Sequence, residues 1–176
     1  MRKKLLTSLI LIGALIFTTV FAFAGTSISR YTGKSYSHNS RFDTSVMVNG
    51  LDVSVYQKTI DWQQAKADGI DFAIVRVGGR GYGAEGKMYS DDNFKQNIEG
   101  AKAAGVLVGI YFFSQAIDEM EAIAEARYAV ELMNEAGVSE LDLPIFMDYE
   151  FAGGSSGRLN QAKLSKAKAT RIARAF

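Results

Sequence analysis

LPIFMDYE, at residues 143–150, joins an apolar run to two carboxylates that lie two positions apart. Side chains alternate between the faces of a β-strand, so a strand here places Asp148 and Glu150 on one face, with Cα atoms about 6.6 Å apart. Two such acids repel each other and contribute nothing obvious to folding. Acid/base chemistry gains from the pair, because one carboxyl can stay protonated while the other is ionised. The alternative is a strand end whose acids simply reach solvent.

From residue 48 onward, short apolar runs alternate with helical patterns. The runs predict strands at residues 48–55, 71–77, 106–113 and 143–149, and the helical patterns predict helices at residues 62–67, 91–104, 118–135 and 160–174. Four strand–helix units in strict alternation predict an α/β protein with a parallel sheet. Winding in one direction favours a β/α barrel. A doubly wound sheet is the alternative, because the sequence does not show where the strand order would reverse.

Residues 1–24 have the pattern of a signal peptide. Arg2, Lys3 and Lys4 precede an apolar run that ends in Ala22-Phe23-Ala24, with small residues where a signal peptidase cleaves. The apolar run is also long enough to span a bilayer, so an uncleaved N-terminal anchor is the alternative and the one route to membrane association. In either case we expect the rest of the chain to be secreted or associated with the cell wall.

Residues 25–47 are rich in serine and threonine and contain no long apolar run. They predict a flexible spacer rather than a packed element, and the single histidine, His38, is expected to be solvated within it. The chain has no cysteine, which excludes disulfides and thiolate metal sites. Removing residues 1–24 takes away three of the 20 basic residues and none of the 19 acidic ones. No basic excess remains to indicate nucleic-acid binding.

In parallel α/β folds, functional sites form at the carboxyl ends of the strands. The polar residues at the predicted ends are Asp52, Ser54, Gln57, Arg76, Arg80, Tyr111, Ser114, Gln115, Asp148, Tyr149 and Glu150. Asp52 interrupts an apolar strand, and a buried acid is costly unless it is paired or functional. Arg76 lies within another apolar strand and is the candidate structural partner of Asp52. Tyr111 is expected either in the core or against a sugar.

The loop at residues 81–86, GYGAEG, matches the pattern G-x-G-x-x-G without the context of a dinucleotide site. Such a site requires the glycines to open a helix, whose N-terminus then faces the pyrophosphate. Here Glu85 adds negative charge, and the next helix is predicted to begin only near Asp91. We therefore interpret these residues as a mobile loop that lines the cleft.

The ordered set formed by Asp52, Gln57, Asp61-Trp62, Arg76, Gly109–Phe113 and Asp148–Glu150 resembles glycoside hydrolase family 25. Members of this family are exported lysozymes (N-acetylmuramidases) that hydrolyse the β-1,4 bond between N-acetylmuramic acid and N-acetylglucosamine in peptidoglycan. The resemblance covers residues 48–176. It implies a TIM-like β/α barrel, of which this chain supplies about the first four βα units. It also implies peptidoglycan glycan strands as the partner, with no cofactor and no metal.

The resemblance implies three catalytic residues. Glu150 corresponds to the general acid, and Asp148 to the carboxylate that stabilises an oxazolinium-like intermediate formed by the acetamido group of the substrate. Asp52 corresponds to the acid on the first strand that shapes the sugar site. The residues expected to bind substrate are Arg76, Tyr111, Gln57, Gln115 and Tyr149.

The chain departs from the family pattern in three places. Tyr56 stands where many members have tryptophan, and Lys58 where glycine is common. The chain ends at Phe176 after four βα units, whereas closed β/α barrels typically have about 250 residues. We therefore expect a catalytic domain that is incomplete at its C-terminus, with an open sheet edge and exposed apolar surface.

Three alternatives remain for the function of the chain. It could be a non-catalytic cell-wall-binding module, an inactive truncated fragment of such an enzyme, or a chitinase-like hydrolase. The last lacks support, because the D-x-x-D-x-D-x-E run of chitinases is absent around residues 142–150.

Overall fold

The computed structural model describes residues 24–28 and 33–176. The predicted signal peptide lies outside these residues except for Ala24. In the described part of the chain, no helix is both long and apolar enough to cross a membrane.

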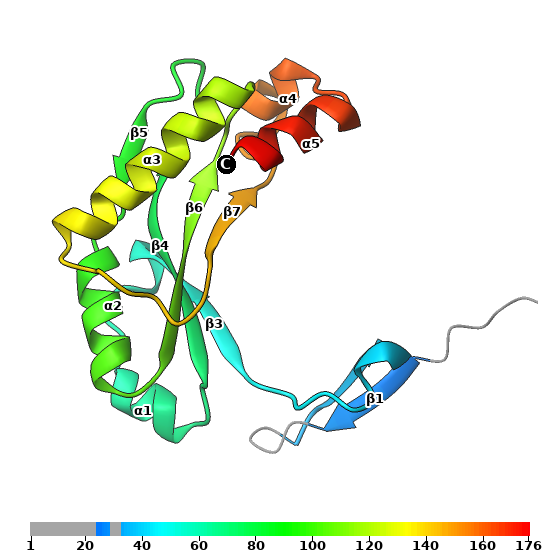
Figure 1. The fold of residues 1–176 in the computed structure, drawn as a ribbon, viewed down its shortest axis with the longest axis vertical. Helices are drawn as coiled ribbons and strands as arrows, with labels where there is room; N and C mark the ends of the chain where they lie inside the picture. The colour runs from blue at the N-terminus through cyan, green and yellow to red at the C-terminus, as the bar shows by residue number, and fades with distance from the viewer. Residues whose placement is uncertain (1–23, 29–32) are drawn as a thin grey trace, which may run out of the picture.

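A curved, mostly parallel sheet forms the body of the protein (Figure 1). Its strands lie in the order β3 (Gly50–Val53), β4 (Phe72–Arg80), β6 (Leu107–Ser114) and β7 (Ile145–Tyr149), and all three pairings are parallel. A short strand, β5 (Met88–Ser90), pairs antiparallel with the end of β4. The strand order follows the chain order without reversal, as in a β/α barrel and unlike a doubly wound sheet. Within the described residues the sheet stays open, with β3 and β7 at its edges.

Three helices cover one face of this sheet, and two more follow β7 (Figure 1). The helices are α1 (Trp62–Ala67), α2 (Phe94–Ala103), α3 (Glu119–Glu135), α4 (Arg158–Ala162) and α5 (Lys166–Ala175). Asp61 caps α1 by accepting a hydrogen bond from the Gln64 backbone, and Asp118 caps α3 in the same way from Glu121. These caps satisfy backbone N–H groups that have no partner within the helix, so they fix where each helix begins.

Alternate residues of the strands face opposite sides of the sheet. Toward the helices point apolar side chains, of which Val75, Val108, Ile110 and Phe112 are fully buried. The register places the other set on the open side: Asp52 lies beside Ile74, and Phe113 beside Asp148. Tyr111 lies between Arg76 of β4 and Phe146 of β7. In a closed barrel this second side is the interior. The described sheet therefore corresponds to part of the wall of a β/α barrel.

Several predicted boundaries are wrong. The first strand is shorter than residues 48–55, because a 3-10 turn at Val55–Gln57 is capped by Ser54 and ends it. Residues 78–90 are not one loop, since β4 continues to Arg80 and pairs with β5. The predicted helix at residues 160–174 is instead split into α4 and α5 at Lys163, whose φ of +46° lies in the left-handed region.

Residues 25–28 and 33–47 contain regular secondary structure, which the prediction of a flexible spacer did not include. They contain the antiparallel strands β1 (Ala24–Ile28) and β2 (Ser35–Asn39). His38 is half-buried in this hairpin, with its Nε2 atom 2.7 Å from the Ser27 hydroxyl. The hairpin is missed by a hydropathy pattern because backbone pairing holds it without a row of apolar side chains.

Candidate active site

Two adjoining cavities lie on the open side of the sheet, toward the carboxyl ends of its strands. Their volumes are about 510 and 370 Å³, and both are lined by Asp52, Tyr111, Asp148 and Glu150. The larger cavity is completed by Ile74, Phe146 and Met147. The smaller one is completed by Ser54, Tyr56, Gln57, Arg76, Tyr82, Tyr89 and Phe113. Most of the sequence-predicted site residues thus come together around one continuous hollow.

Three carboxylates reach this hollow from the two edges of the sheet. Asp148 lies one residue before the end of β7 and Glu150 directly follows the strand, and both line the same cavities, as the strand alternation predicts. Asp52 comes from β3 at the other edge. It is exposed rather than buried in an apolar strand, so the cost of burying an unpaired acid does not arise. The reason is that no described segment covers the open side of β3.

The pKa of Asp148 lies above its ordinary value. Burial is the main cause, and the negative charges of Glu150 and Asp52 raise the pKa further, while the positive charge of Arg76 opposes them. Asp148 is half-buried, whereas Glu150 is exposed at the mouth of the hollow. The surroundings therefore hold a proton on Asp148 to a higher pH than an isolated aspartate would keep it.

Arg76 pairs with Asp91 and not with Asp52. Its Nε and Nη2 atoms both lie 2.7 Å from Asp91 Oδ2, and both side chains are buried. Its guanidinium also lies over two rings, 5.1 Å from the centroid of Tyr56 and 5.9 Å from that of Tyr89. Burial acts to lower the pKa of Arg76, but the hydrogen bond and charge of Asp91 raise it overall. Arg76 thus holds two aromatic walls of the smaller cavity.

Asp91 supports the wall of the candidate site, a role that sequence reasoning missed. Asp91 or Asp92 was expected to cap α2, but the helix N-cap is Asn93. Besides pairing with Arg76, Asp91 Oδ2 accepts a hydrogen bond of 3.0 Å from the Val55 backbone. This bond ties β5 to the turn that carries Tyr56. A signal was present in the sequence, since a buried arginine in an apolar strand requires an acid from a neighbouring segment.

Tyr111 and Gln57 lie where the sequence placed them. Tyr111 is half-buried between the two cavities, and burial is the main reason that its pKa is raised to about 12. Its phenol is therefore a hydrogen-bond donor at neutral pH. Gln57 lines the smaller cavity, and its side-chain oxygen accepts hydrogen bonds from the backbone N and hydroxyl of Ser54, at 2.8 and 3.2 Å.

Gln115 and Tyr149 do not line these cavities, unlike the other residues that the sequence predicts to bind substrate. Tyr149 is next to Asp148 in β7 and faces the other side, where its hydroxyl donates to the Ala116 carbonyl at 2.7 Å. Gln115 is fully buried behind the end of β6. Its amide nitrogen donates to the carbonyls of Ser114 at 2.9 Å and Glu150 at 2.7 Å. Gln115 therefore contacts the backbone of a site residue rather than the hollow.

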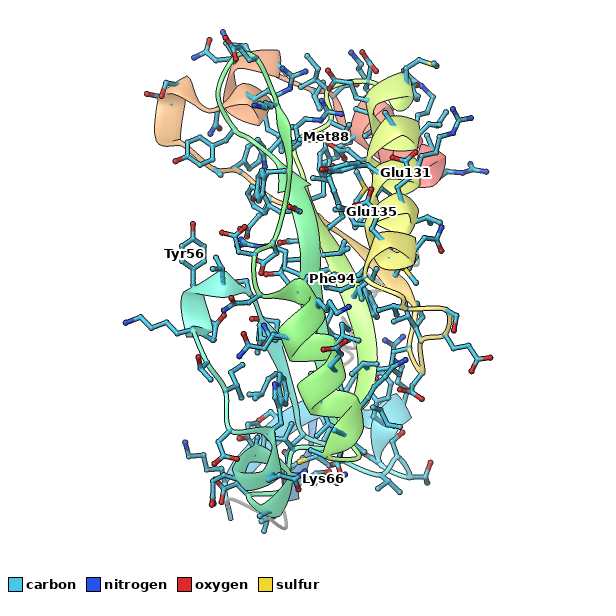
Figure 2. All side chains as sticks on the ribbon, turned by 90° about the vertical axis from the view of Figure 1, so that its left-hand side faces the viewer. Tyr56, Lys66, Met88, Phe94, Glu131 and Glu135 are labelled. Carbon is cyan, nitrogen blue, oxygen red and sulfur yellow. The ribbon has the colours of Figure 1, made fainter. Side chains whose placement is uncertain are left out.

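Tyrosines form much of the remaining wall. Figure 2 shows Tyr56 projecting from its turn, away from the helices. Tyr82 comes from the loop after β4, which lines the hollow as expected of residues 81–86. Tyr89 comes from β5, and burial is the main reason that its pKa is raised. Tyrosine rings stack on the apolar faces of sugars while their hydroxyls bind polar groups, so such a wall suits a carbohydrate.

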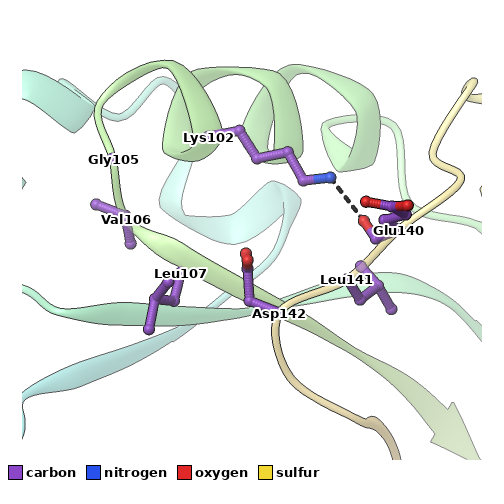
Figure 3. A pocket seen from close by; sticks show the side chains of 7 residues that line it. All are labelled: Lys102, Gly105, Val106, Leu107, Glu140, Leu141 and Asp142. Carbon is purple, nitrogen blue, oxygen red and sulfur yellow. Dashed lines mark hydrogen bonds between the residues drawn. The ribbon is translucent and has the colours of Figure 1, made fainter.

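A further pocket of about 320 Å³ lies at the amino-terminal edge of the sheet (Figure 3). Its polar groups are used within the fold: Lys102 Nζ donates to the Glu140 carbonyl at 2.6 Å, and Asp142 accepts from the Val108 backbone at 2.9 Å. This edge of a parallel sheet serves stability rather than catalysis. Residues 24–28 and 33–176 contain no group of three or more His, Asp and Glu side chains that could hold a metal ion.

Known proteins with related sequences are lysozymes and a protein of unassigned function. Lysozyme M1 of Streptomyces globisporus is 37% identical over 68 residues, which are 39% of this chain and 21% of that protein. The autolytic lysozyme of Clostridium acetobutylicum is 27% identical over 62% of this chain and 30% of its own length. The uncharacterised protein YegX of Escherichia coli K12 is 28% identical over 72% of this chain and 44% of its own length. The chain thus spans less than half the length of these relatives.

Solved structures share the fold. The autolysin LytC of Streptococcus pneumoniae, determined in complex with a synthetic peptidoglycan ligand, superposes with a TM-score of 0.61 at 22% identity. The superposition covers 87% of this chain and 34% of that one. The muramidase of Acremonium alcalophilum gives a TM-score of 0.55 at 22% identity over 74% of this chain and 58% of that one. The family model for glycosyl hydrolases family 25 matches residues 51–176, and the chain belongs to this family.

Proposed function

We propose that this chain is an exported N-acetylmuramidase that hydrolyses the β-1,4 bond between N-acetylmuramic acid and N-acetylglucosamine in bacterial peptidoglycan. The observation that carries the proposal is the convergence of Asp52, Asp148 and Glu150 on one tyrosine-walled hollow at the carboxyl ends of parallel strands. Glycoside hydrolysis needs a carboxyl that donates a proton and a negative group beside an oxocarbenium-like transition state. Family membership and the peptidoglycan ligand of LytC support the same substrate class.

Glu150 acts as the general acid in this proposal. It protonates the glycosidic oxygen as the bond from the sugar C1 breaks, and its position at the mouth of the hollow gives it access to the leaving sugar. The carbonyl oxygen of the substrate acetamido group then closes on C1. Water opens this intermediate and returns a proton to Glu150, so the enzyme is restored.

Asp148 and Asp52 act on the reacting sugar. Asp148 accepts a hydrogen bond from the acetamido N–H of the substrate and stabilises the positive charge of the oxazolinium-like intermediate. Asp52 faces Asp148 and Glu150 from β3 and borders the same sugar. Tyr111, which lies between the two cavities, donates a hydrogen bond to the substrate. Tyr56, held by Arg76, supplies a surface on which a sugar ring stacks.

The decisive experiment compares residues 25–176 with the Glu150→Gln variant, both shown by circular dichroism to be folded. Each is incubated with peptidoglycan, the products are reduced with borohydride, and the new chain ends are identified by mass spectrometry. We expect muramitol ends from the parent. The Glu150→Gln variant should yield at least about 100-fold fewer such ends, because the proton donor is lost. Glu131→Gln, an exposed acid on α3 (Figure 2), is the matched control and should retain activity.

The same experiment separates the competing functions. A folded parent that sediments with peptidoglycan but yields no new ends would identify a wall-binding module instead. A folded parent that neither yields new chain ends nor sediments with peptidoglycan would reject both functions.

A further inference from the structure

Arg158, the first residue of α4, joins four segments at the rim of the sheet. Its backbone N–H donates to the Tyr82 carbonyl at 2.8 Å, and its Nη1 donates to the Ala84 carbonyl at 2.8 Å. Its Nε donates to the Gln115 carbonyl at 3.1 Å, and its Nη2 forms an ion pair with Glu121 of α3. The bonds thus run from α4 to the β4–β5 loop, to the end of β6 and to α3.

The packing around Arg158 is close. Only 11% of its side chain is exposed. A Cβ atom at Gly86 would lie 2.9 Å from the Arg158 guanidinium carbon, and Gly86 has a φ of +55°. A side chain at position 86 would therefore strain the backbone and displace the guanidinium from its present place, so glycine suits the close approach of the loop to Arg158.

The loop that Arg158 holds carries Tyr82, which lines the hollow. The ring of Tyr82 also packs against Gly153, where a Cβ would lie only 2.5 Å from it. Tyr82 is thus placed by contacts on both sides, from the loop backbone that Arg158 binds and from the segment after Glu150.

The second arm of this arrangement reaches the proposed acid. Arg158 binds the carbonyl of Gln115, and the Gln115 amide nitrogen donates to the Glu150 carbonyl at 2.7 Å. The backbone of Gln115 is also held by Glu125, which pairs with Arg80 at 2.6 Å and accepts from the Gln115 backbone at 3.3 Å. A continuous set of hydrogen bonds therefore connects the Tyr82 loop with the backbone of Glu150.

We propose that Arg158 is a positioning residue for substrate recognition: it fixes Tyr82 as a wall of the glycan cleft and keeps that wall in register with Glu150 through Gln115. The glycan substrate rests on the proposed function, whereas the fixing of the loop does not. Arg158 does not touch the hollow itself, and its effect on binding passes through Tyr82.

The test measures loop order and glycan binding separately. Hydrogen exchange of the amides in residues 81–87 is followed by mass spectrometry in the parent, Arg158→Met and Arg171→Met. Arg171 is the matched control, because it also pairs with a glutamate of α3 but 60% of its side chain is exposed. We expect exchange of the loop to be about tenfold faster in Arg158→Met and unchanged in Arg171→Met. Arg158→Lys, which keeps the charge without the planar fork, should also loosen the loop.

Binding of a soluble tetrasaccharide of alternating N-acetylglucosamine and N-acetylmuramic acid is measured by calorimetry. We expect Arg158→Met to raise Kd about tenfold in the parent, and less than about twofold in a Tyr82→Ala background, because the wall it positions is already gone. Equal effects in both backgrounds would overturn the proposed route through Tyr82. Unchanged loop exchange in both folded Arg158 variants would overturn the positioning role itself. A parent that binds no tetrasaccharide overturns the proposed substrate, while loop exchange still decides whether Arg158 fixes the loop.

Discussion

The two faces of the same sheet differ in what their side chains do. One residue of each neighbouring pair, such as Phe112, is fully buried under the helices. The next, such as Phe113 or Tyr111, lines the open hollow. Burial of apolar area stabilises the fold, whereas the open face carries acids whose mutual repulsion opposes it. The comparison indicates that stability and the proposed activity reside in alternating residues of the same strands.

The largest effect should come from the covered face. Phe112→Ala removes a fully buried ring that packs edge-on against Tyr128, with centroids 6.4 Å apart. We expect it to lower the free energy of unfolding by about 3–5 kcal/mol, because a cavity remains. Urea denaturation followed by circular dichroism measures this loss. Phe146→Ala on the open face, where the ring is 43% exposed, is the control and should cost about 1 kcal/mol or less. Equal losses would contradict the division between the faces.

A loss of about 3 kcal/mol is expected for Arg80→Met, because it leaves Glu125 buried without its cation. Burial already raises the pKa of Glu125, and removing Arg80 raises it further. The carboxyl can then escape part of the cost by taking up a proton. The destabilisation should therefore be larger at pH 7 than at pH 5, as measured by urea denaturation at both values. A loss that does not change with pH would show that Glu125 is not the group left uncompensated.

A smaller effect, on binding alone, is expected for Tyr111→Phe. The variant keeps the ring but removes a phenol that is protonated at neutral pH, with a pKa of about 12. Loss of one neutral hydrogen bond should weaken binding of the soluble tetrasaccharide by about 1 kcal/mol, or roughly fivefold in Kd. Calorimetry measures Kd, and thermal melting should show little change. Unaltered affinity would indicate that Tyr111 belongs to the core and not to the sugar site.

The smallest expected effect has the opposite sign. Because the pKa of Asp148 is raised in the folded state, its contribution to stability is present at low pH and is lost as pH rises through that folded value. Asp148→Asn should therefore stabilise the protein at pH 7 by a few tenths of a kcal/mol, since the partly exposed site is screened, and this gain should vanish near pH 3. Thermal melting at both pH values is the measurement, with the exposed Asp92→Asn as control. A lower melting temperature of Asp148→Asn at pH 7 would indicate that the Asp148 carboxylate makes a favourable contact in the folded protein.

Local patterns predicted the parts of the molecule that depend on one segment. The alternation in residues 143–149 placed Asp148 and Glu150 on one face, and the caps Asp61 and Asp118 begin the predicted helices. Alternation within the same strand also showed that Tyr149 faces away from Asp148, but the sequence prediction grouped residues by their position at the strand end. Side-chain direction, and not position along the chain, was the relevant property.

Contacts that depend on two separate segments of the chain were not predicted from the sequence. The partner of Arg76 is Asp91, which reaches it only because β5 folds back on β4. Gln115 follows the last residue of β6 and turns inward to the Glu150 backbone, a direction that a strand pattern does not specify. The partner of Arg76 and the direction of Gln115 were both missed, because tertiary contacts, and not the spacing of residues in the sequence, decide which side chains are buried and which pair.

The spatial order of the strands has a consequence for how the molecule assembles. Among the parallel strands, β4 pairs with β3, β6 with β4 and β7 with β6, so each joins the parallel strand that comes before it in the chain. A chain that emerges N-terminus first can therefore add strands one at a time, with no need to insert a late segment between two early ones. Asp148 lies in the last of these strands and Glu150 immediately follows it. The acids thus meet only after the surface that supports them has formed.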